Sequence, residues 1–246
     1  MAVAGCGRMA SLSVMTYNVG AFGKYMEDST GDIAQIVSSL GADVVALNEL
    51  DSCNRRHDVY QLEKFAEALG GWDYAYSSSF PFAGGSYGNG IASRTTISHK
   101  EKVLLPMSDG IEQRSMIVVE TKDYVLACTH LDHKGVNSRV DQARFINDWM
   151  TERYAGCRKP VLLCGDMNSL PDDEAIREFS RNWTLLSVTD PTYPSHEPRI
   201  CIDYIFCLNP ELLRGDVKSY IPAQEGISGF SDHLPVVVKF LYLRNR

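Results

Sequence analysis

Short apolar runs that end in a polar residue recur along this chain. Four of them lie at residues 12–17, 43–47, 124–129 and 161–164. Runs of this length, bounded by turn residues, are typical of buried strands. The run at 161–164 is closed by Gly165 and leads to Asp166 and Asn168, so an acid and an amide are predicted at the mouth of a strand.

Helical spacing appears between several of these runs. Residues 30–40 have four apolar residues in a helical pattern, Ile33, Ile36, Val37 and Leu40. Gly41 is suited to end that helix, and the strands on either side of it make a βαβ pattern. Three more helices are predicted, at residues 61–69, at residues 138–154 and after Pro171.

The remaining segments predict a mixed sheet system. Residues 116–120 and 124–129 are typical of a β-hairpin, and residues 77–90 of a long polar and aromatic loop that could edge a binding site. A strand is predicted at residues 200–207, with Asp203 at its middle, and a last strand at residues 234–241. Because some strands follow short turns and others follow helices, a mixed sheet with helices outside is favoured over a purely parallel one.

The composition indicates a single globular domain. The 246 residues suit one large domain, expected to span 1–246 with a core at about 12–243. No apolar run approaches the roughly 20 residues that cross a bilayer. A net charge of −7 counts against sequence-independent binding of long nucleic acid, which usually needs a basic surface. A monomer is expected.

The cysteines and the N-terminus add little to this interpretation. Four cysteines lie in or beside apolar runs, Cys128, Cys164, Cys201 and Cys207, and are predicted to be buried free thiols. Residues 3–6 resemble the end of a bacterial lipoprotein signal without the apolar segment that should precede it. Either the match is chance or the start is truncated, and localisation stays undecided.

Polar residues with chemical potential gather at the strand ends. They are Asn18, Glu49, His130, Asp166, Asn168, Asp232 and His233. Each alone would most often be a turn or satisfied polar residue. Asp203 is different, because an unpaired carboxylate inside a strand costs several kcal/mol and needs a partner such as a histidine at the sheet rim.

Together these residues suit phosphoryl transfer. Oxygen ligands such as Glu49, Asp232 and Asn18 suit a hard cation, and Mg²⁺ is typically held by one or two carboxylates. A further acid could activate a water, while imidazoles and an amide neutralise charge on a phosphate.

The motifs around these residues resemble the endonuclease/exonuclease/phosphatase superfamily, also called deoxyribonuclease-I-like. In chain order they are MTYNVG, ALNEL, YGNGIASR, THL, GDMN, IDYIF and SDHLPV, spread from Met15 to Val238. The resemblance implies an α+β fold, a four-layer α/β/β/α sandwich. Its two mixed, mostly antiparallel sheets pack face to face with helices outside, and the site lies at one end of the sheets.

The resemblance also implies roles for single residues. Glu49 would be the principal Mg²⁺ ligand, helped by Asn18 and Asp232, and Mn²⁺ is expected to substitute. Asp166 would activate the attacking water. The phosphate and its charge would be handled by Asn168, His130 and by His233 oriented by Asp203. Substrate contacts are expected from Asn89, Arg94 and Arg139, the last with Gln142 in support. Which histidine acts as the acid is left open.

The expected activity is hydrolysis of a phosphoester, with a phosphodiester favoured and a nuclease as one alternative. A second alternative is a zinc hydrolase built on His130 and His133, with Asp132 nearby and His196 as the third histidine. A third is a binding protein that keeps the fold without activity. The sequence does not select the natural substrate or exo over endo action.

Overall fold

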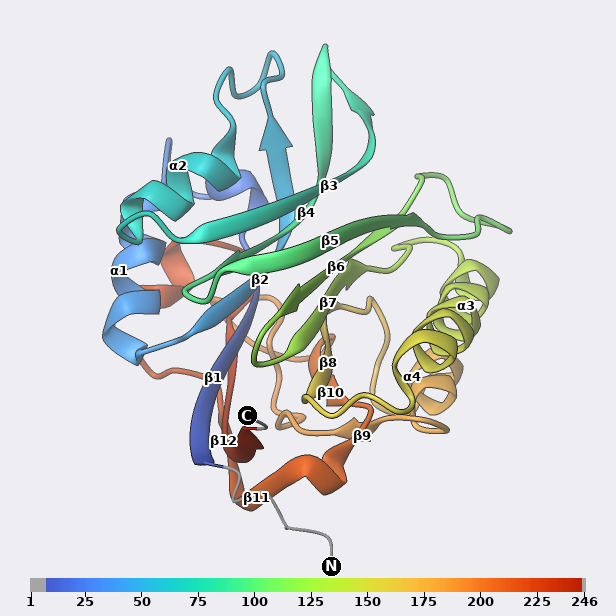
Figure 1. The fold of residues 1–246 in the computed structure, drawn as a ribbon. Helices are drawn as coiled ribbons and strands as arrows, with labels where there is room; N and C mark the ends of the chain where they lie inside the picture. Colours follow the sequence, from blue (N-terminus) through green and yellow to red (C-terminus); the bar gives the residue numbers. More distant parts are fainter. Residues whose placement is uncertain (1–7, 245–246) are drawn as a thin grey trace, which may run out of the picture.

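Two six-stranded sheets form the centre of the computed structural model, which describes residues 8–244 (Figure 1). The first sheet contains β1 (Arg8–Asn18), β2 (Val44–Ser52), β3 (Asp73–Phe82), β4 (Gly85–Ser93), β11 (Leu213–Tyr220) and β12 (Val236–Arg244). Its strand order is β11-β12-β1-β2-β4-β3. The second sheet contains β5 (Ile97–Leu104), β6 (Ser115–Thr121), β7 (Val125–His130), β8 (Val161–Asp166), β9 (Thr184–Leu185) and β10 (Asp203–Cys207). Its order is β5-β6-β7-β8-β10-β9.

Four α-helices lie outside the sheets, two on each side (Figure 1). They are α1 (Thr30–Leu40), α2 (Gln61–Ala68), α3 (Val136–Tyr154) and α4 (Glu174–Phe179). Short 3₁₀ helices occupy Gly20–Phe22, Pro210–Leu212 and Ile227–Gly229. β1 and β2 are parallel through α1, and β7 and β8 are parallel through α3, while the other paired strands are antiparallel. The predicted four-layer α/β/β/α sandwich with mixed sheets is therefore confirmed.

Three apolar layers hold these four layers together. Leu12 and Val14 of β1 point into the layer between the sheets, where they join Val119 and Leu126 of the second sheet. The alternate residue Met15 packs against α1 and α2, and a third layer lies between the second sheet and α3 and α4. Because both faces of the central strands are covered, these strands appear in the sequence as continuous apolar runs.

The predicted loop at residues 77–90 is wrong, because these residues form most of the hairpin β3–β4. Its turn is Ala83–Gly84, and both residues have positive φ, as a tight hairpin turn needs. The glycines that suggested a loop are required by close packing. A Cβ at Gly88 would lie 1.9 Å from the carbonyl oxygen of Ser77 on the neighbouring strand.

Other differences concern strand edges and helix starts. Asp203 opens β10 instead of lying at its middle, α3 starts at Val136 and α4 at Glu174. β5 and β11 gave no clear signal because they lie at sheet edges and are only partly buried, which dilutes the apolar pattern. Residues 3–6 lie outside the described residues.

The cysteine prediction holds for the residues that the structure describes. Cys128, Cys164, Cys201 and Cys207 are free and buried. Among residues 8–244, no helix combines the length and apolarity needed to cross a membrane.

Candidate active site

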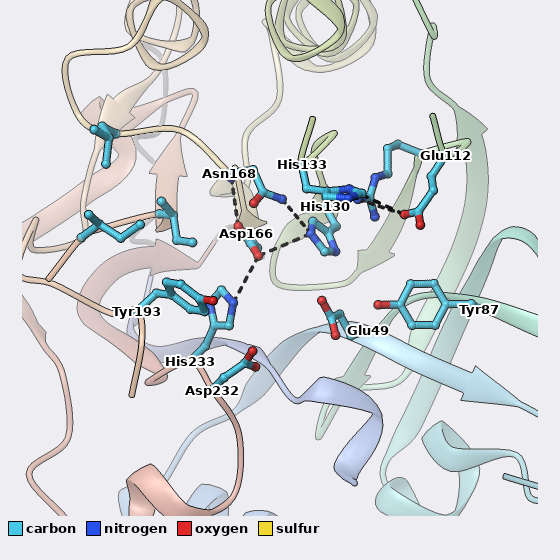
Figure 2. A pocket seen from close by; sticks show the side chains of 14 residues that line it. Glu49, Tyr87, Glu112, His130, His133, Asp166, Asn168, Tyr193, Asp232 and His233 are labelled. Carbon is cyan, nitrogen blue, oxygen red and sulfur yellow. Dashed lines mark hydrogen bonds and ion pairs between the residues drawn. The ribbon is translucent and has the colours of Figure 1, made fainter. Parts of the chain in front are cut away.

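Strand direction brings the predicted site residues to one edge of the sandwich. The parallel pairs β1/β2 and β7/β8 end at this edge, where Asn18, His130 and Asp166 are their last residues. β10 and β12 run antiparallel to their neighbours and therefore begin there, so that Asp203 pairs directly with Asp166. A cavity of about 600 Å³ opens at this edge (Figure 2).

Glu49 reaches the cavity through an irregularity in β2. The register between β2 and β4 shifts between Leu47 and Leu50, and Glu49 has a φ of +63°. Such a bulge with a left-handed residue re-aims a side chain at a cost of roughly 1–3 kcal/mol, which the surrounding sheet must offset. The carboxylate is thereby presented to the cavity while its neighbours stay in the sheet.

Asn48 links the two sheets beneath the cavity. Its Oδ1 accepts from the backbone N–H of Asp166 at 2.9 Å, and its Nδ2 donates to the carbonyl of Thr129 at 2.8 Å. Nδ2 also donates to Oδ1 of Asn89 at 3.0 Å. Asn89 is buried and donates onward to the carbonyl of Ser115, so it supports Asn48 and does not face a substrate as predicted.

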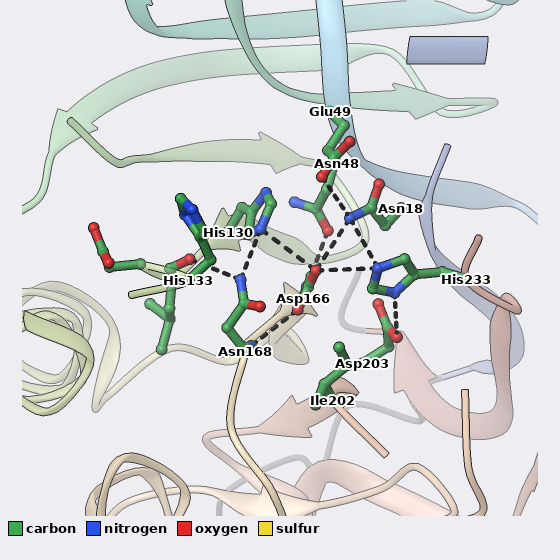
Figure 3. Close-up of polar contacts among 12 residues, drawn as sticks. Asn18, Asn48, Glu49, His130, His133, Asp166, Asn168, Ile202, Asp203 and His233 are labelled. Atoms are coloured by element: carbon green, nitrogen blue, oxygen red, sulfur yellow. Dashed lines mark hydrogen bonds and ion pairs between the residues drawn. The ribbon is translucent and has the colours of Figure 1, made fainter. Parts of the chain in front are cut away.

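Asp166 is the centre of the polar network (Figure 3). Its Oδ2 accepts from Nδ2 of Asn18 at 3.1 Å and lies 3.4 Å from His130 Nε2 and 3.6 Å from His233 Nε2. Its Oδ1 accepts from the backbone N–H of Asn168. Burial raises the pKa of Asp166 to about 7, although the neighbouring His233 acts in the opposite direction.

Asp203 holds His233 from the side away from Asp166. Oδ2 of Asp203 lies 2.9 Å from Nδ1 of His233 and also accepts from the hydroxyl of Thr192 at 2.6 Å. Burial lowers the pKa of His233, but Asp203 and Asp166 outweigh it and raise that pKa to about 10. His233 is therefore an imidazolium between two buried acids at neutral pH.

His130 is in the opposite electrostatic state. Burial and the nearby Arg114 lower the pKa of His130 well below its usual range, so the ring is neutral. Nδ2 of Asn168 lies 2.9 Å from His130 Nε2 and also donates to the carbonyl of Leu131 at 3.1 Å. Because an amide nitrogen can only donate, Nε2 of His130 accepts and Nδ1 carries the proton. Nδ1 has no partner within the described residues.

The predicted metal ligands differ in how they face the cavity. Glu49 and Asp232 line it with their carboxylates. Asn18 turns its amide nitrogen towards Glu49 at 3.2 Å, while its oxygen accepts from the backbone N–H of Gly20. That backbone donor fixes the amide orientation, so the amide nitrogen of Asn18 and not its oxygen faces Glu49.

A cation already lies beside these carboxylates. Nζ of Lys24 is 2.7 Å from Oδ2 of Asp232. Partial burial lowers the pKa of Lys24, but Asp232 and Glu49 outweigh it and raise that pKa. The pair Glu49 and Asp232 thus favours positive charge, which is the property that a divalent metal site needs.

A second group of possible ligands is explained by its hydrogen bonds. Ligand atoms of Asp166, Asp203 and His233 lie within 4.8 Å of one another. Nδ1 of His233 lies 2.9 Å from Oδ2 of Asp203 and Nε2 lies 3.6 Å from Oδ2 of Asp166, so an imidazolium between two carboxylates accounts for the same short distances. We therefore assign this group to the acid–imidazolium network.

Arg94 and Arg139 do not join the cavity. Arg94 follows β4 at the far end of the sheet, where it lies 3.4 Å from Asp43 and over the ring of Trp72. Arg139 on α3 donates to the carbonyl of Asp132. The structure therefore does not place either arginine where the predicted substrate contact needs it. Gln142 also supports the backbone of Asp132.

The zinc alternative loses its geometric basis. Nδ1 of His133 accepts from the guanidinium of Arg114 at 3.0 Å, and the ring of His196 contacts that of Tyr25 at a tilt of 43°, with centroids 4.8 Å apart. Asp132 caps the backbone N–H groups of Lys134 and Gly135. Among the described residues, these histidines therefore do not form a set of three ligands.

Several residues that line the cavity were not among the predictions. On one side lie Tyr87, Glu112 and Arg114, next to the His133 of the zinc alternative, and further lining residues are Leu170, Tyr193, Ile200 and Ile202. Glu112 and Arg114 stand at the entrance of β6, the same position that singled out the other candidates. Tyr87 was hidden by the loop prediction for residues 77–90.

The fold and the site define a class of proteins with a polar, acidic cavity at one edge of a four-layer sandwich. The chain belongs to the Endonuclease/Exonuclease/phosphatase family, whose sequence profile matches residues 15–233. No curated protein sequence matches the chain significantly.

Solved structures share this fold at low sequence identity. An endonuclease/exonuclease/phosphatase from Bacteroides vulgatus has a TM-score of 0.77 and 18% identity, covering 95% of this chain and 99% of that one. The mannosyl-6-phosphatase of Bacteroides thetaiotaomicron has a TM-score of 0.69 and 20% identity, covering 93% and 99%. Truncated TDP2 from Caenorhabditis elegans has a TM-score of 0.72 and 20% identity, covering 94% and 97%.

Proposed function

We propose that this chain is a Mg²⁺-dependent hydrolase of phosphoester bonds that prefers phosphodiesters. The observation that carries the proposal is the arrangement around Asp166, a buried carboxylate beside the imidazolium of His233 in a cavity walled by Glu49 and Asp232. Attack of water on a phosphate needs a base with a pKa near the working pH, a fixed positive charge and a cation site.

Glu49 and Asp232 would hold the cation, which would stabilise negative charge on the phosphoryl oxygens as a Lewis acid. The Lys24 ammonium beside Asp232 supports this assignment, because the same carboxylates already attract a positive charge. Mn²⁺ should substitute, since it accepts the same oxygen ligands.

Asp166 orients the attacking water and takes its proton. The pKa of about 7 lets a fraction of Asp166 act as a base at neutral pH while still driving proton removal. Asn18 and the backbone N–H of Asn168 keep its two oxygens in fixed positions. This support lowers the reorganisation needed during the reaction.

The phosphate is held by the imidazole and amide side of the cavity. His233 keeps its proton and stabilises negative charge on the phosphate. Both hydrogens of the Asn168 amide are engaged, so a phosphate oxygen that accepts from it must replace His130 as its partner. His130, with its proton on Nδ1, acts as a neutral ring in this arrangement.

The comparisons support hydrolysis of a phosphoester and leave the ester type open. One structural neighbour is a mannosyl-6-phosphatase and another is TDP2, within a family named for nucleases and phosphatases. A phosphomonoesterase is therefore the second candidate. The net charge of −7 makes long nucleic acid the less favoured substrate.

The test is turnover of bis-p-nitrophenyl phosphate and p-nitrophenyl phosphate with Mg²⁺, with Mn²⁺ and with a chelator. Activity should require the metal and return when Mg²⁺ or Mn²⁺ is added back. Asp166→Asn and Glu49→Gln should abolish it, whereas Asp172→Asn, at an exposed position nearby, should keep it. Absence of metal-dependent turnover would overturn the proposed hydrolase. If Mg²⁺ and a phosphate mimic also fail to bind, the alternative of a non-catalytic binding protein is excluded as well.

A further inference from the structure

The cavity extends beyond the residues proposed to hold the phosphate, and its wall there is polar. There, Glu112, Arg114 and His133 form one cluster, which lies across Asp166 from Tyr193 (Figure 2). Nη2 of Arg114 lies 3.0 Å from Nδ1 of His133 and 3.3 Å from Oε2 of Glu112. These contacts join the three residues to one another and do not include Asp166, His233 or the proposed cation ligands.

The arginine at the back of this cluster is buried and incompletely paired. Arg114 is 3% exposed, and its Nε has no hydrogen-bond partner within the described residues. A buried donor left without a partner costs about 1–3 kcal/mol, more when the group is charged. Arg114 also lines the cavity, so a ligand there could accept a hydrogen bond from its guanidinium.

The cluster presents both donors and acceptors. Because a guanidinium can only donate, Nδ1 of His133 accepts from Arg114, and the ring proton is then on Nε2. Glu112 is about one-third exposed and offers carboxylate oxygens as acceptors. Groups that both donate and accept, such as hydroxyls, match this set, whereas a second phosphate would be repelled by Glu112.

The segment that carries Glu112 and Arg114 is fixed from both ends. The backbone N–H of Leu105 donates to the carbonyl of Arg114 at 2.9 Å. At the other end, Asp109 accepts from the backbone N–H of Ser138 at 2.7 Å, in the first turn of α3. A subsite on such a rigid segment is preorganised for its ligand, which lowers the entropic cost of binding.

We propose that Glu112, Arg114 and His133 form a subsite that binds the hydroxyl groups of an uncharged sugar or polyol substituent of the phosphoester. This inference rests on the proposed function, because the subsite adjoins the residues assigned to the phosphate. It makes these residues determinants of substrate specificity, while Asp166 and its neighbours carry out the reaction.

The test uses substrates that differ only in their hydroxyl groups. The first set comprises p-nitrophenyl phosphodiesters of methyl glucoside, mannoside and galactoside joined through O6. The reference carries a (6-methoxytetrahydropyran-2-yl)methyl group, which has the same ring and methoxy group without ring hydroxyls. At least one hexoside should have a kcat/KM about tenfold or more above the reference, because unpaired polar groups in a site disfavour the analogue that lacks hydroxyls.

Substitutions then locate the preference. Glu112→Gln and Arg114→Lys should bring the ratio of kcat/KM for hexoside and reference substrates towards one, mainly through KM. Glu101→Gln is the matched control, since Glu101 lies 3.8 Å from His99 just as Glu112 lies 3.8 Å from His133, but it is on β5 outside the cavity. The control should keep the wild-type ratio.

Three results would overturn the subsite. They are a ratio near one in the wild-type protein, a ratio unchanged by Glu112→Gln, and preference for an analogue that carries a 4-carboxycyclohexylmethyl group. If no diester is turned over, the proposed function fails, but the subsite is still measurable. Calorimetry on Asp166→Asn with hexose 6-phosphates and tetrahydropyran-2-ylmethyl phosphate should then show the same preference in binding.

Discussion

Nδ1 of His233 lies 2.9 Å from Oδ2 of Asp203, and its other ring nitrogen faces Asp166 at 3.6 Å. This places one imidazolium between a carboxylate that is fixed by Thr192 and one that faces the cavity. Asp203 therefore both orients the ring and stabilises its charge, and its removal should affect catalysis through His233.

We expect Asp203→Asn to reduce kcat by about 10²- to 10³-fold, the range seen when one preorganised charge-stabilising group is lost. The double variant with His233→Ala should be little worse than His233→Ala alone, since both residues act as one unit. Steady-state kinetics on the two single variants and the double variant measure this. Asp190→Asn, at an exposed position, serves as the control. If the losses of the two single variants add up in the double variant, Asp203 and His233 act independently and the prediction is wrong.

If Asp232 is a metal ligand, as proposed, Lys24 competes with the metal ion for it. The Lys24–Asp232 pair is partly exposed, and such pairs contribute about 0.2–1 kcal/mol. Lys24→Met should therefore tighten Mn²⁺ binding, measured by calorimetry, by roughly two- to fivefold. Lys64→Met is the matched control, because Lys64 makes a similar exposed pair with Asp28 at 2.6 Å. Unchanged or weaker binding in Lys24→Met would argue that Asp232 is not a ligand.

Gly165 lets β7 and β8 approach closely enough to bring His130 and Asp166 together. It has a φ of +141°, and a Cβ there would lie 1.9 Å from the carbonyl oxygen of Thr129. Gly165→Ala should lower the free energy of unfolding by about 3 kcal/mol or more. A drop of roughly 6–12 °C in Tm would correspond to this loss. Gly156→Ala, which meets no atom within 4 Å, should leave Tm nearly unchanged.

Asp28 anchors the segment that carries Lys24. Its Oδ1 accepts from the backbone N–H of Thr30 at the start of α1, and its Oδ2 pairs with Lys64. Burial acts to raise the pKa of Asp28, but Lys64 and Thr30 outweigh it and lower that pKa to about 2. Asp28→Ala should cost about 1 kcal/mol of stability at pH 7, the usual net contribution of one hydrogen bond with an exposed ion pair.

The effect of Asp28 should depend on pH with a definite sign. The folded pKa lies below the ordinary value of 3.8, so the stabilisation is present above about pH 4 and is lost as pH falls towards 2. Urea unfolding of the wild type and Asp28→Ala should show a difference that is constant from pH 7 to 5 and shrinks between pH 4 and 2. A difference independent of pH would mean that the carboxylate is not the stabilising group.

The sequence by itself determined the central strands and the polar residues at their ends. Strands covered on both faces must be apolar at successive positions, so β1, β2, β7 and β8 could be predicted from short stretches of sequence alone. A polar residue at the end of such a strand lies at the sheet edge whatever the register, which is why His130 and Asp166 were found. Glu49, two residues after its apolar run, lies inside β2 at the bulge.

Only the tertiary structure decided what each polar group contacts. Asn89 and Arg94 are five residues apart in the same predicted motif. Asn89 is buried beneath the cavity, whereas Arg94 lies at the far end of the sheet. The edge strands, the close packing that requires Gly88, and the cluster of Glu112, Arg114 and His133 all depend on partners distant in sequence. Local sequence patterns report burial and period, whereas contacts between distant segments are fixed by strand pairing and packing, which no local pattern contains.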